Sequence, residues 1–163
     1  MHIKLKKKYL YYLQYKAKCS IGKRGITDSK VEGDNKTPRG SFKIISIFYR
    51  KDRIQEIKTD IKKEIIKKNM GWCDDVRSKF YNKLIRFPFR YSAEKLYLKS
   101  SVYDIILVLD YNIKKITRGK GSAIFIHLAK KKYLPTKGCI ALSYTDMKLL
   151  IQNINKKSIV TIY

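Results

Sequence analysis

Short apolar segments separated by turn-forming residues run through most of this sequence, and they restrict the folds open to it. The segments are rich in β-branched and aromatic side chains and cover residues 9–19, 41–49, 103–110, 122–129, 139–142 and 158–162. Such runs, bounded by Gly, Pro, Asn or Asp, predict strands. We expect a mainly β protein, an antiparallel β-sandwich or partly closed barrel with small helical additions. At 163 residues the chain is long enough for one core, so a single domain over residues 1–163 is predicted.

Three segments have helical patterns. Ser143 is a candidate N-cap with Asp146 three residues later, and the apolar stripe that follows is Met147, Leu150, Ile151 and Ile154. Residues 52–68 carry isoleucines at helical spacing, with lysines near the C-terminal end where they suit the helix dipole. Residues 92–99 predict a short helix with Ser92 as its N-cap and Leu96 on its buried side.

The basic excess has two interpretations. The formal net charge is +25, from 38 Lys and Arg against 13 Asp and Glu. A surplus of this size is typical of proteins that bind polyanions, with lysines on phosphates and tyrosines stacked on bases. The lysines are nevertheless scattered through every segment, and no helix-turn-helix, zinc-finger or RNP motif occurs. We therefore expect a solvated basic surface and no specific nucleic acid, with a non-catalytic nucleic-acid-binding domain as the alternative.

The three cysteines, Cys19, Cys73 and Cys139, lack the spacing of a zinc site. No metal or organic cofactor is expected. Cys19 is predicted to fill a gap in the core, although a disulfide between Cys19 and Cys73 stays open.

The stretch from residue 121 to 143 holds the residues with the greatest chemical potential. His127 falls near the C-terminal end of the strand predicted at 122–129, where alternation places Ala123, Phe125 and His127 on one face. Cys139 follows twelve positions later, directly after Gly138, whose missing side chain permits a tight turn and close approach of a substrate. An imidazole beside a thiol can take its proton and produce the reactive thiolate. The alternative is a pair of buried structural residues.

Further candidates come from two other segments. Trp72, Asp74 and Asp75 could line a groove in which the acids receive an amine, or they could form a turn in which the carboxylates bind backbone N–H groups. Asn112 follows the strand predicted at 103–110, where its amide could orient the imidazole, bind substrate, or simply form a turn.

Several motifs together resemble the L,D-transpeptidase catalytic-domain family (YkuD type). Its hallmark is a histidine on a strand, then a loop and Ser/Thr-x-Gly-Cys, which His127, Thr136, Lys137, Gly138 and Cys139 match. In order along the chain, the sequence is also similar to a compact single-domain subfamily at KVEGDNKTPRGSF (30–42), GWCDD (71–75), YN (81–82), YDIILVL (103–109) and GSAIFIH (121–127). The resemblance covers the chain from about residue 19 to its end. Two positions depart from it, because many relatives carry histidine where Lys137 stands and arginine where Ala141 stands.

The resemblance implies an enzyme. Cys139 would attack a peptidoglycan stem peptide at an L-to-D junction and form a thioester, with His127 as general base and acid. The oxyanion would need hydrogen-bond donors, most simply the backbone N–H of Cys139 and that of a nearby loop residue such as Gly138. The thioester would pass to an amine of a second stem, which forms a cross-link, or to water. Thr136 and Lys137 become candidate substrate-binding residues, and the Cys and His are expected at one open end of the β fold.

The sequence also supports expectations about the cellular location of the protein and about alternative functions. The resemblance implies a place in the cell envelope or periplasm, yet residues 1–19 lack the apolar core of a secretory signal, which leaves the export route open. No run approaches the roughly 20 apolar residues of a membrane span, and a monomer is expected. Rivals are a papain-like cysteine peptidase, in which cysteine precedes histidine, and a non-catalytic wall-binding relative.

Overall fold

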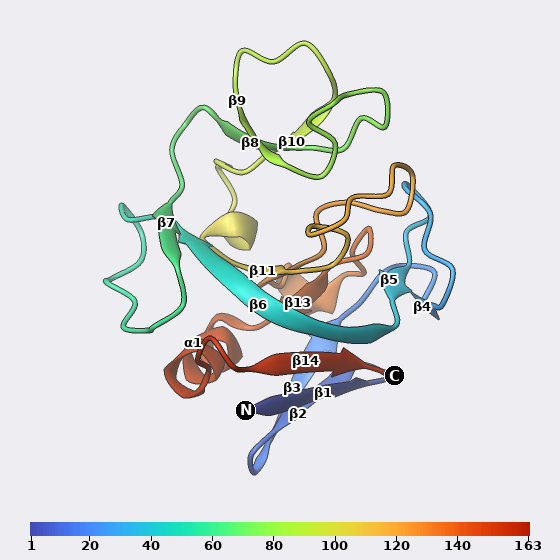
Figure 1. Cartoon of the computed structure of the whole chain (residues 1–163). Helices are drawn as coiled ribbons and strands as arrows, with labels where there is room; N and C mark the ends of the chain where they lie inside the picture. The colour runs from blue at the N-terminus through green and yellow to red at the C-terminus, as the bar shows by residue number, and fades with distance from the viewer.

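Eight strands close a β-barrel, and the rest of the chain packs around it (Figure 1). The computed structural model describes all residues from 1 to 163. The strands are β1 (His2–Lys6), β2 (Tyr9–Tyr12), β3 (Tyr15–Ser20), β4 (Ile26–Thr27), β5 (Thr37–Pro38), β6 (Gly40–Tyr49), β7 (Lys63–Ile65), β8 (Met70–Cys73), β9 (Leu84–Arg86), β10 (Ala93–Lys95), β11 (Ile105–Leu109), β12 (Phe125–Leu128), β13 (Ile140–Leu142) and β14 (Ile159–Ile162). The helices are the 3₁₀ turns η1 (Ser101–Tyr103) and η2 (Lys131–Tyr133) and the α-helix α1 (Tyr144–Asn153).

The barrel has the strand order β11-β12-β13-β3-β2-β1-β14-β6, and pairing of β11 with β6 closes it. β7 adds to β6 from outside the ring. The predicted mainly β barrel is therefore confirmed, and it is fully closed. It is also mixed rather than antiparallel, because β1 runs parallel to β14 and β12 runs parallel to β13.

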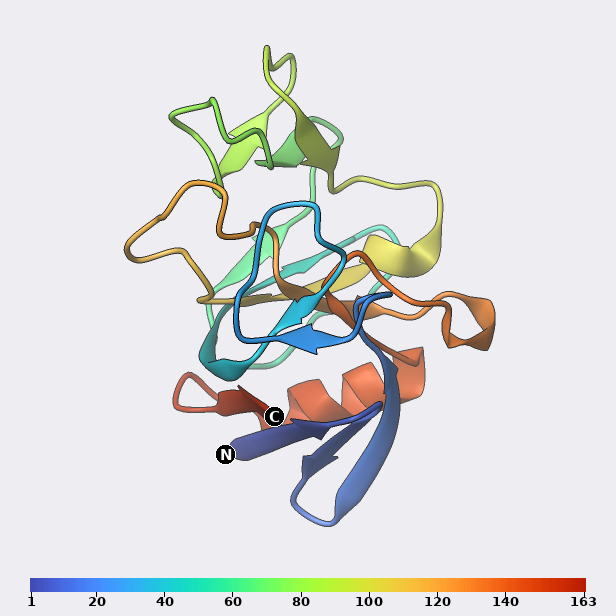
Figure 2. The same cartoon turned by 90° about the vertical axis from the view of Figure 1, so that its right-hand side faces the viewer.

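Two small sheets lie outside the barrel. β8 pairs with β9 and β10 in a three-stranded sheet, and β4 pairs with β5. The three-stranded sheet lies at the top of the molecule, above the barrel, in both views (Figures 1 and 2).

Two hydrophobic clusters divide the interior. The larger has 26 buried residues, with members from all eight barrel strands, and it fills the barrel and the space under α1. The smaller has 11 and lies on the outer face of β6, β11 and β12, where the three-stranded sheet covers it. Alternation along β12 explains the division, since Ile126 and Leu128 join the first cluster and Phe125 the second. The predicted faces of this strand are confirmed.

A bulge changes the faces of β6. The register with β11 shifts between Val108, opposite Ser46, and Leu109, opposite Ile44, so one residue of β6 is inserted. Ile44 and Ile47 consequently both point into the barrel, although residues three positions apart in a regular strand lie on opposite faces.

Two predicted helices are wrong. Residues 52–68 form turns and extended chain that include β7. Ile57 and Ile61 are buried, but in the main hydrophobic cluster rather than along a helix face. The isoleucines of this segment are β-branched and have modest helix propensity. Pairing of β7 with β6 is therefore favoured over a helix. Residues 92–99 instead supply β10, which pairs with β8, although Leu96 is buried as predicted.

The segment at residues 9–19 forms a hairpin rather than one strand. β2 and β3 pair across a two-residue loop in which Leu13 has a φ of 48°. No Gly or Asn marks this turn, and those are the residues that make such loops visible in a sequence.

The predicted start of α1 is confirmed. The Ser143 hydroxyl accepts a hydrogen bond from the Asp146 N–H at 3.0 Å, and Met147, Leu150 and Ile151 are buried. Measured for length and apolar character together, no helix of this chain qualifies as a membrane span.

Lysines within the barrel strands lie on the solvent side of those strands. In β1 and β3, Lys4, Lys6, Lys16 and Lys18 are exposed, while the residues between them point into the core. This pattern matches the predicted solvated basic surface.

Candidate active site

His127 and Cys139 lie on one face of two neighbouring strands. β12 and β13 are parallel, with His127 opposite Ala141, so Cys139 stands just before β13 and two positions earlier than the partner of His127. Residues placed this way share a face and have Cα atoms roughly 8 Å apart. Both are nearly closed off from solvent, with exposed fractions of 7% for His127 and 9% for Cys139. The pair thus lies on the outer face of the barrel wall, under the three-stranded sheet, and not at an open end of the barrel as expected.

The hydrogen bond of His127 defines its tautomer. Its Nδ1 lies 2.9 Å from the Leu128 carbonyl oxygen, which can only accept, so Nδ1 carries the proton. Nε2 of the neutral ring therefore keeps its lone pair. Burial, aided by the positive charge of Lys130, lowers the pKa of His127 to about 4. The ring is neutral near pH 7 and able to act as a base.

The Cys139 thiol is protonated at rest. Its Sγ donates to the Ala123 carbonyl at 3.0 Å, and no hydrogen bond joins it to the imidazole. Burial, followed by the negative charge of Glu94, raises the pKa of Cys139 to about 12, while Lys30 acts in the opposite direction.

The buried side chain of Asn82 holds the segment whose Ala123 carbonyl accepts the hydrogen bond from the Cys139 thiol. Asn82, 2% exposed, accepts hydrogen bonds from the Trp72 indole at 2.9 Å and the Ala123 N–H at 3.0 Å. Its amide nitrogen donates to the carbonyl oxygens of Asn112 and Tyr111 at 2.7 and 3.3 Å. Ala123 has a φ of 51°, a conformation that costs energy for alanine and that these bonds help to maintain.

The turn before Cys139 requires glycine. Gly138 has a φ of 145°, and a Cβ there would lie 2.8 Å from the Lys36 carbonyl oxygen. The Thr136 hydroxyl organises the turn, since it donates to the Cys139 carbonyl at 2.6 Å and accepts from the Gly138 N–H at 3.1 Å. The Gly138 N–H is therefore occupied, whereas the Cys139 N–H makes no hydrogen bond within the protein. Of the two expected oxyanion donors, only Cys139 has a free N–H in this structure.

A buried tyrosine, Tyr103, and a half-buried glutamate, Glu94, lie beside the pair. The Tyr103 ring packs edge-on against the His127 ring at 5.2 Å between centroids, and its hydroxyl donates to Glu94 at 2.6 Å. Burial raises the pKa of Glu94, and its charge disfavours the thiolate of Cys139. The three-stranded sheet thus brings one carboxyl group to the site.

Other predicted site residues have structural contacts. Trp72 is 6% exposed and packs edge-on against Phe48 and Phe125, so its side chain belongs to the hydrophobic core and does not line a groove. Asp75 accepts the Arg77 N–H at 3.0 Å and its guanidinium at 2.7 Å, which lowers the pKa of Asp75 and matches the turn interpretation.

Of the remaining predicted residues, Asn112 forms a turn, whereas the charges of Asp74 and Lys137 act on Glu94 in the site. Asn112 has a φ of 52° and bonds Gly121 and Thr117 through its side chain, so it forms a turn and does not orient His127. Asp74 has one buried carboxylate oxygen without a hydrogen-bond partner, and its charge contributes to the raised pKa of Glu94. Lys137 is exposed, and its charge acts on Glu94 in the opposite sense. Cys19 and Cys73 are free thiols.

Sequence reasoning missed Asn82, Tyr103, Glu94 and Thr37 as parts of the site. Asn82, Tyr103 and Thr37 occur within the motifs quoted for the family resemblance, but their types and spacing gave no sign of their partners. The partners of Asn82 and Thr37 lie 10 to 101 residues away along the chain.

Comparison with known proteins gives one clear match. The profile of the YkuD family, described as the L,D-transpeptidase catalytic domain, matches residues 1–162. No curated protein matches the chain.

Proposed function

The chain belongs to the L,D-transpeptidase catalytic-domain family, and we propose that it transfers acyl groups between peptidoglycan stem peptides through a thioester on Cys139. Membership of this family implies L,D-transpeptidase-type activity on peptidoglycan. The observation that carries the proposed mechanism is the tautomer of His127: with Nδ1–H on the Leu128 carbonyl, Nε2 keeps its lone pair, and His127 and Cys139 share one face of the two strands.

The first half of the reaction forms the thioester. His127 Nε2 takes the thiol proton while Sγ attacks the carbonyl carbon at the L-to-D junction of a donor stem. The Cys139 N–H, unpaired in the protein, donates to the oxyanion. Collapse breaks the C–N bond, and the imidazolium returns its proton to the departing amine of the terminal D-amino acid.

The second half releases the enzyme. An amine of an acceptor stem attacks the thioester, its proton passes to His127, and the C–S bond breaks to regenerate the thiol. Water in place of the amine gives a free carboxylate, which is L,D-carboxypeptidase activity. Glu94 and Asp74 lie on the side from which the three-stranded sheet covers the site and suit an incoming ammonium group.

The neutral resting pair supports transfer of the proton during attack rather than a stored thiolate. With the pKa of Cys139 raised to about 12 and that of His127 lowered to about 4, an ion pair is disfavoured before substrate binds. A buried thiol that stays protonated also reacts slowly with oxidants and alkylating agents.

The test is acylation by a carbapenem, a β-lactam that mimics the donor. Mass spectrometry of the intact protein should show one covalent adduct, mapped by digestion to Cys139. Cys139→Ala should abolish it and His127→Ala should slow it by at least about 100-fold, the scale of general-base catalysis. Cys19→Ala is the matched control, because it removes another buried thiol and should retain the adduct. A folded, reduced wild-type protein without an adduct would contradict the proposal.

A further inference from the structure

We propose that Thr37 is a positioning residue that aims the Cys139 N–H at the oxyanion. This inference rests on the proposed function and assigns a role to a residue outside the Cys–His pair. Thr37 lies in the short strand β5, 101 residues before the group that it contacts. It is completely buried. Its hydroxyl oxygen lies 2.8 Å from the carbonyl oxygen of Gly138.

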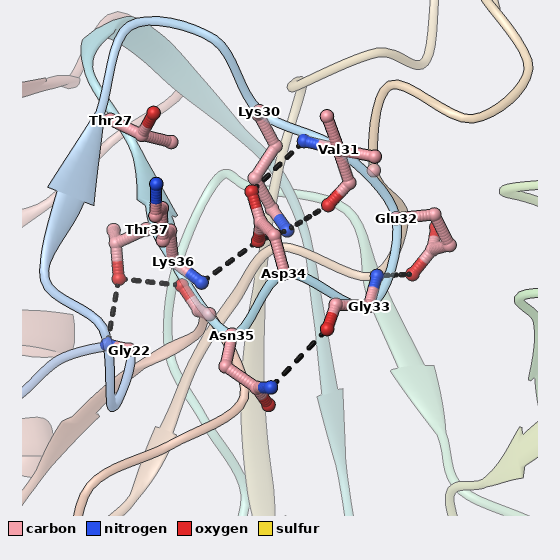
Figure 3. Close-up of polar contacts among 12 residues, drawn as sticks. Gly22, Thr27, Lys30, Val31, Glu32, Gly33, Asp34, Asn35, Lys36 and Thr37 are labelled. Atoms are coloured by element: carbon pink, nitrogen blue, oxygen red, sulfur yellow. Dashed lines mark hydrogen bonds and ion pairs between the residues drawn. The ribbon is translucent and has the colours of Figure 1, made fainter.

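The direction of this hydrogen bond follows from its neighbours. The Gly22 N–H lies 2.9 Å from the Thr37 hydroxyl oxygen and donates to it (Figure 3). The Gly138 carbonyl can only accept, so the hydroxyl proton must be directed at it. Thr37 thus accepts from one segment and donates to another, which leaves its hydroxyl no freedom to rotate.

The bond orients the peptide that carries the catalytic N–H. The Gly138–Cys139 peptide is trans, because the only cis bond in the chain is Phe87–Pro88. In a trans peptide the C=O and the N–H point in opposite directions. With the Gly138 carbonyl held by Thr37, the Cys139 N–H points away from Thr37 and stays free of any protein acceptor. A flip of this peptide would remove the donor from the site.

Thr37 is itself held in place by its surroundings. Its own N–H donates to the Gly25 carbonyl at 2.9 Å. The preceding loop is tied together by Asp34, which accepts from the Val31 and Lys36 backbone N–H groups and from the Lys30 ammonium group (Figure 3). Burial opposes ionisation of Asp34, but these bonds outweigh it and lower its pKa.

The packing at Gly22 and Gly138 leaves little space for adjustment. A Cβ on Gly22 would lie 2.5 Å from the Asn35 carbonyl oxygen, and one on Gly138 would lie 2.8 Å from the Lys36 carbonyl oxygen. The loop that carries Thr37 therefore lies directly against both segments that its hydroxyl joins. This contact makes the position of the Gly138 carbonyl dependent on the loop at residues 30–37.

Two reactions of Cys139 distinguish a positioning role of Thr37 from a general disturbance of the site. Acylation by a carbapenem passes through an oxyanion, whereas alkylation by iodoacetamide does not, although both need the same sulfur. Thr37→Val keeps the branched shape of the side chain and replaces the hydroxyl with a methyl group. We expect it to lower the acylation rate constant by about 10- to 100-fold, part of the 10²–10³ measured for loss of an oxyanion donor. The alkylation rate constant at Cys139 should change less than about threefold.

Controls use the conservative variant and a neighbouring threonine. Thr37→Ser keeps the hydroxyl and should restore the ratio of acylation to alkylation to within about threefold of wild type. Thr27→Val removes a hydroxyl from the paired strand β4, where it accepts only an exposed bond from Ser29, and should leave both rates unchanged. Should Thr37→Val fail to fold, Thr37→Ala, which leaves space for a water, is measured in the same two assays with the same expected loss.

The outcomes distinguish the two proposals. Wild-type protein that is alkylated but never acylated overturns the proposed function and this inference with it. Wild-type protein that is acylated, together with a Thr37→Val or Thr37→Ala variant whose two rates fall equally or not at all, overturns the role of Thr37 alone.

Discussion

Asn82 offers the sharpest test of how the site is held. Its side chain joins four groups from three other segments, namely the Trp72 indole, the Ala123 N–H and the carbonyl oxygens of Tyr111 and Asn112. Because Asn82 is only 2% exposed, truncation leaves these groups without ready access to water. We expect Asn82→Ala to be among the most destabilising single changes in the protein.

The magnitude follows from the contacts. Three of the four bonds are between 2.7 and 3.0 Å, and each buried group left unpaired costs about 1–3 kcal/mol. Partial entry of water into the vacated space recovers some of this, so the net loss is about 4 kcal/mol. For a chain of this size, 1 kcal/mol shifts Tm by about 2–4 °C, which predicts a decrease of roughly 8–16 °C.

Urea unfolding monitored by tryptophan fluorescence and circular dichroism measures the effect. Asn82 has a φ of 55°, so Asn82→Gly, which adopts this conformation without strain, separates hydrogen-bond loss from backbone strain. Asn153→Ala is the matched control, since it removes one side-chain bond, to Leu149, near the end of α1. A loss below about 1 kcal/mol for both Asn82 variants, equal to the control, would refute the argument.

Two further predictions concern stability. Burial lowers the pKa of His127 to about 4, below the unfolded value of about 6.5, so the unfolded chain binds more protons between these pH values and stability should fall as pH decreases from 6.5 to 4. The contribution reaches about 3 kcal/mol. Urea unfolding of wild type and His127→Gln at pH 7 and pH 4.5 isolates it as the change with pH in the difference between their free energies of unfolding. A difference that is the same at both pH values would contradict the prediction. Ser143→Ala removes the N-cap bond to Asp146 and should cost about 1 kcal/mol, a decrease in Tm of about 2–4 °C; a thermal melt with no decrease would show that the cap contributes nothing.

The parts of the structure that could be predicted depend on local pattern. The strands at β11, β12 and β14 follow from apolar runs between turn residues, and the alternating faces of β12 place His127 on the side opposite Ile126. The capping box at Ser143 likewise contains its own partner, Asp146, three residues away. In each case the residues that determine the local structure lie within a few positions of each other.

Predictions failed where pairing with a distant strand decided the conformation. The isoleucines of residues 52–68 fit a helix, but β7 pairs with β6 and Ile57 packs into the barrel instead. The same holds for residues 92–99, because β10 completes a sheet with β8 and thereby delivers Glu94 to the site. Barrel closure between β6 and β11 is also invisible in the sequence, since it joins segments more than fifty residues apart.

The sequence indicated the two candidate reactive residues of the site but not the residues that contact them. A histidine near the end of a strand and a cysteine after glycine are visible as a pair. Thr37, Asn82 and Tyr103 act through partners that only folding brings close: the Gly138 carbonyl, the Ala123 N–H and the His127 ring. Threonine, asparagine and tyrosine are common in turns and cores, so their types alone do not indicate such roles.

These supports act on backbone groups at the site, and this explains why so short a motif can specify it. The Leu128 carbonyl sets the tautomer of His127, the Ala123 carbonyl receives the resting thiol, and the Gly138 carbonyl, held by Thr37, sets the direction of the Cys139 N–H. A backbone carbonyl is supplied by any residue, so the reactive pair needs only the correct path of the chain around it. The departures at Lys137 and Ala141 leave all three carbonyl contacts intact. Ala141 is nevertheless 1% exposed and lies opposite His127 in the register, so a substitution there would change what lies beside the imidazole without altering how the imidazole is held.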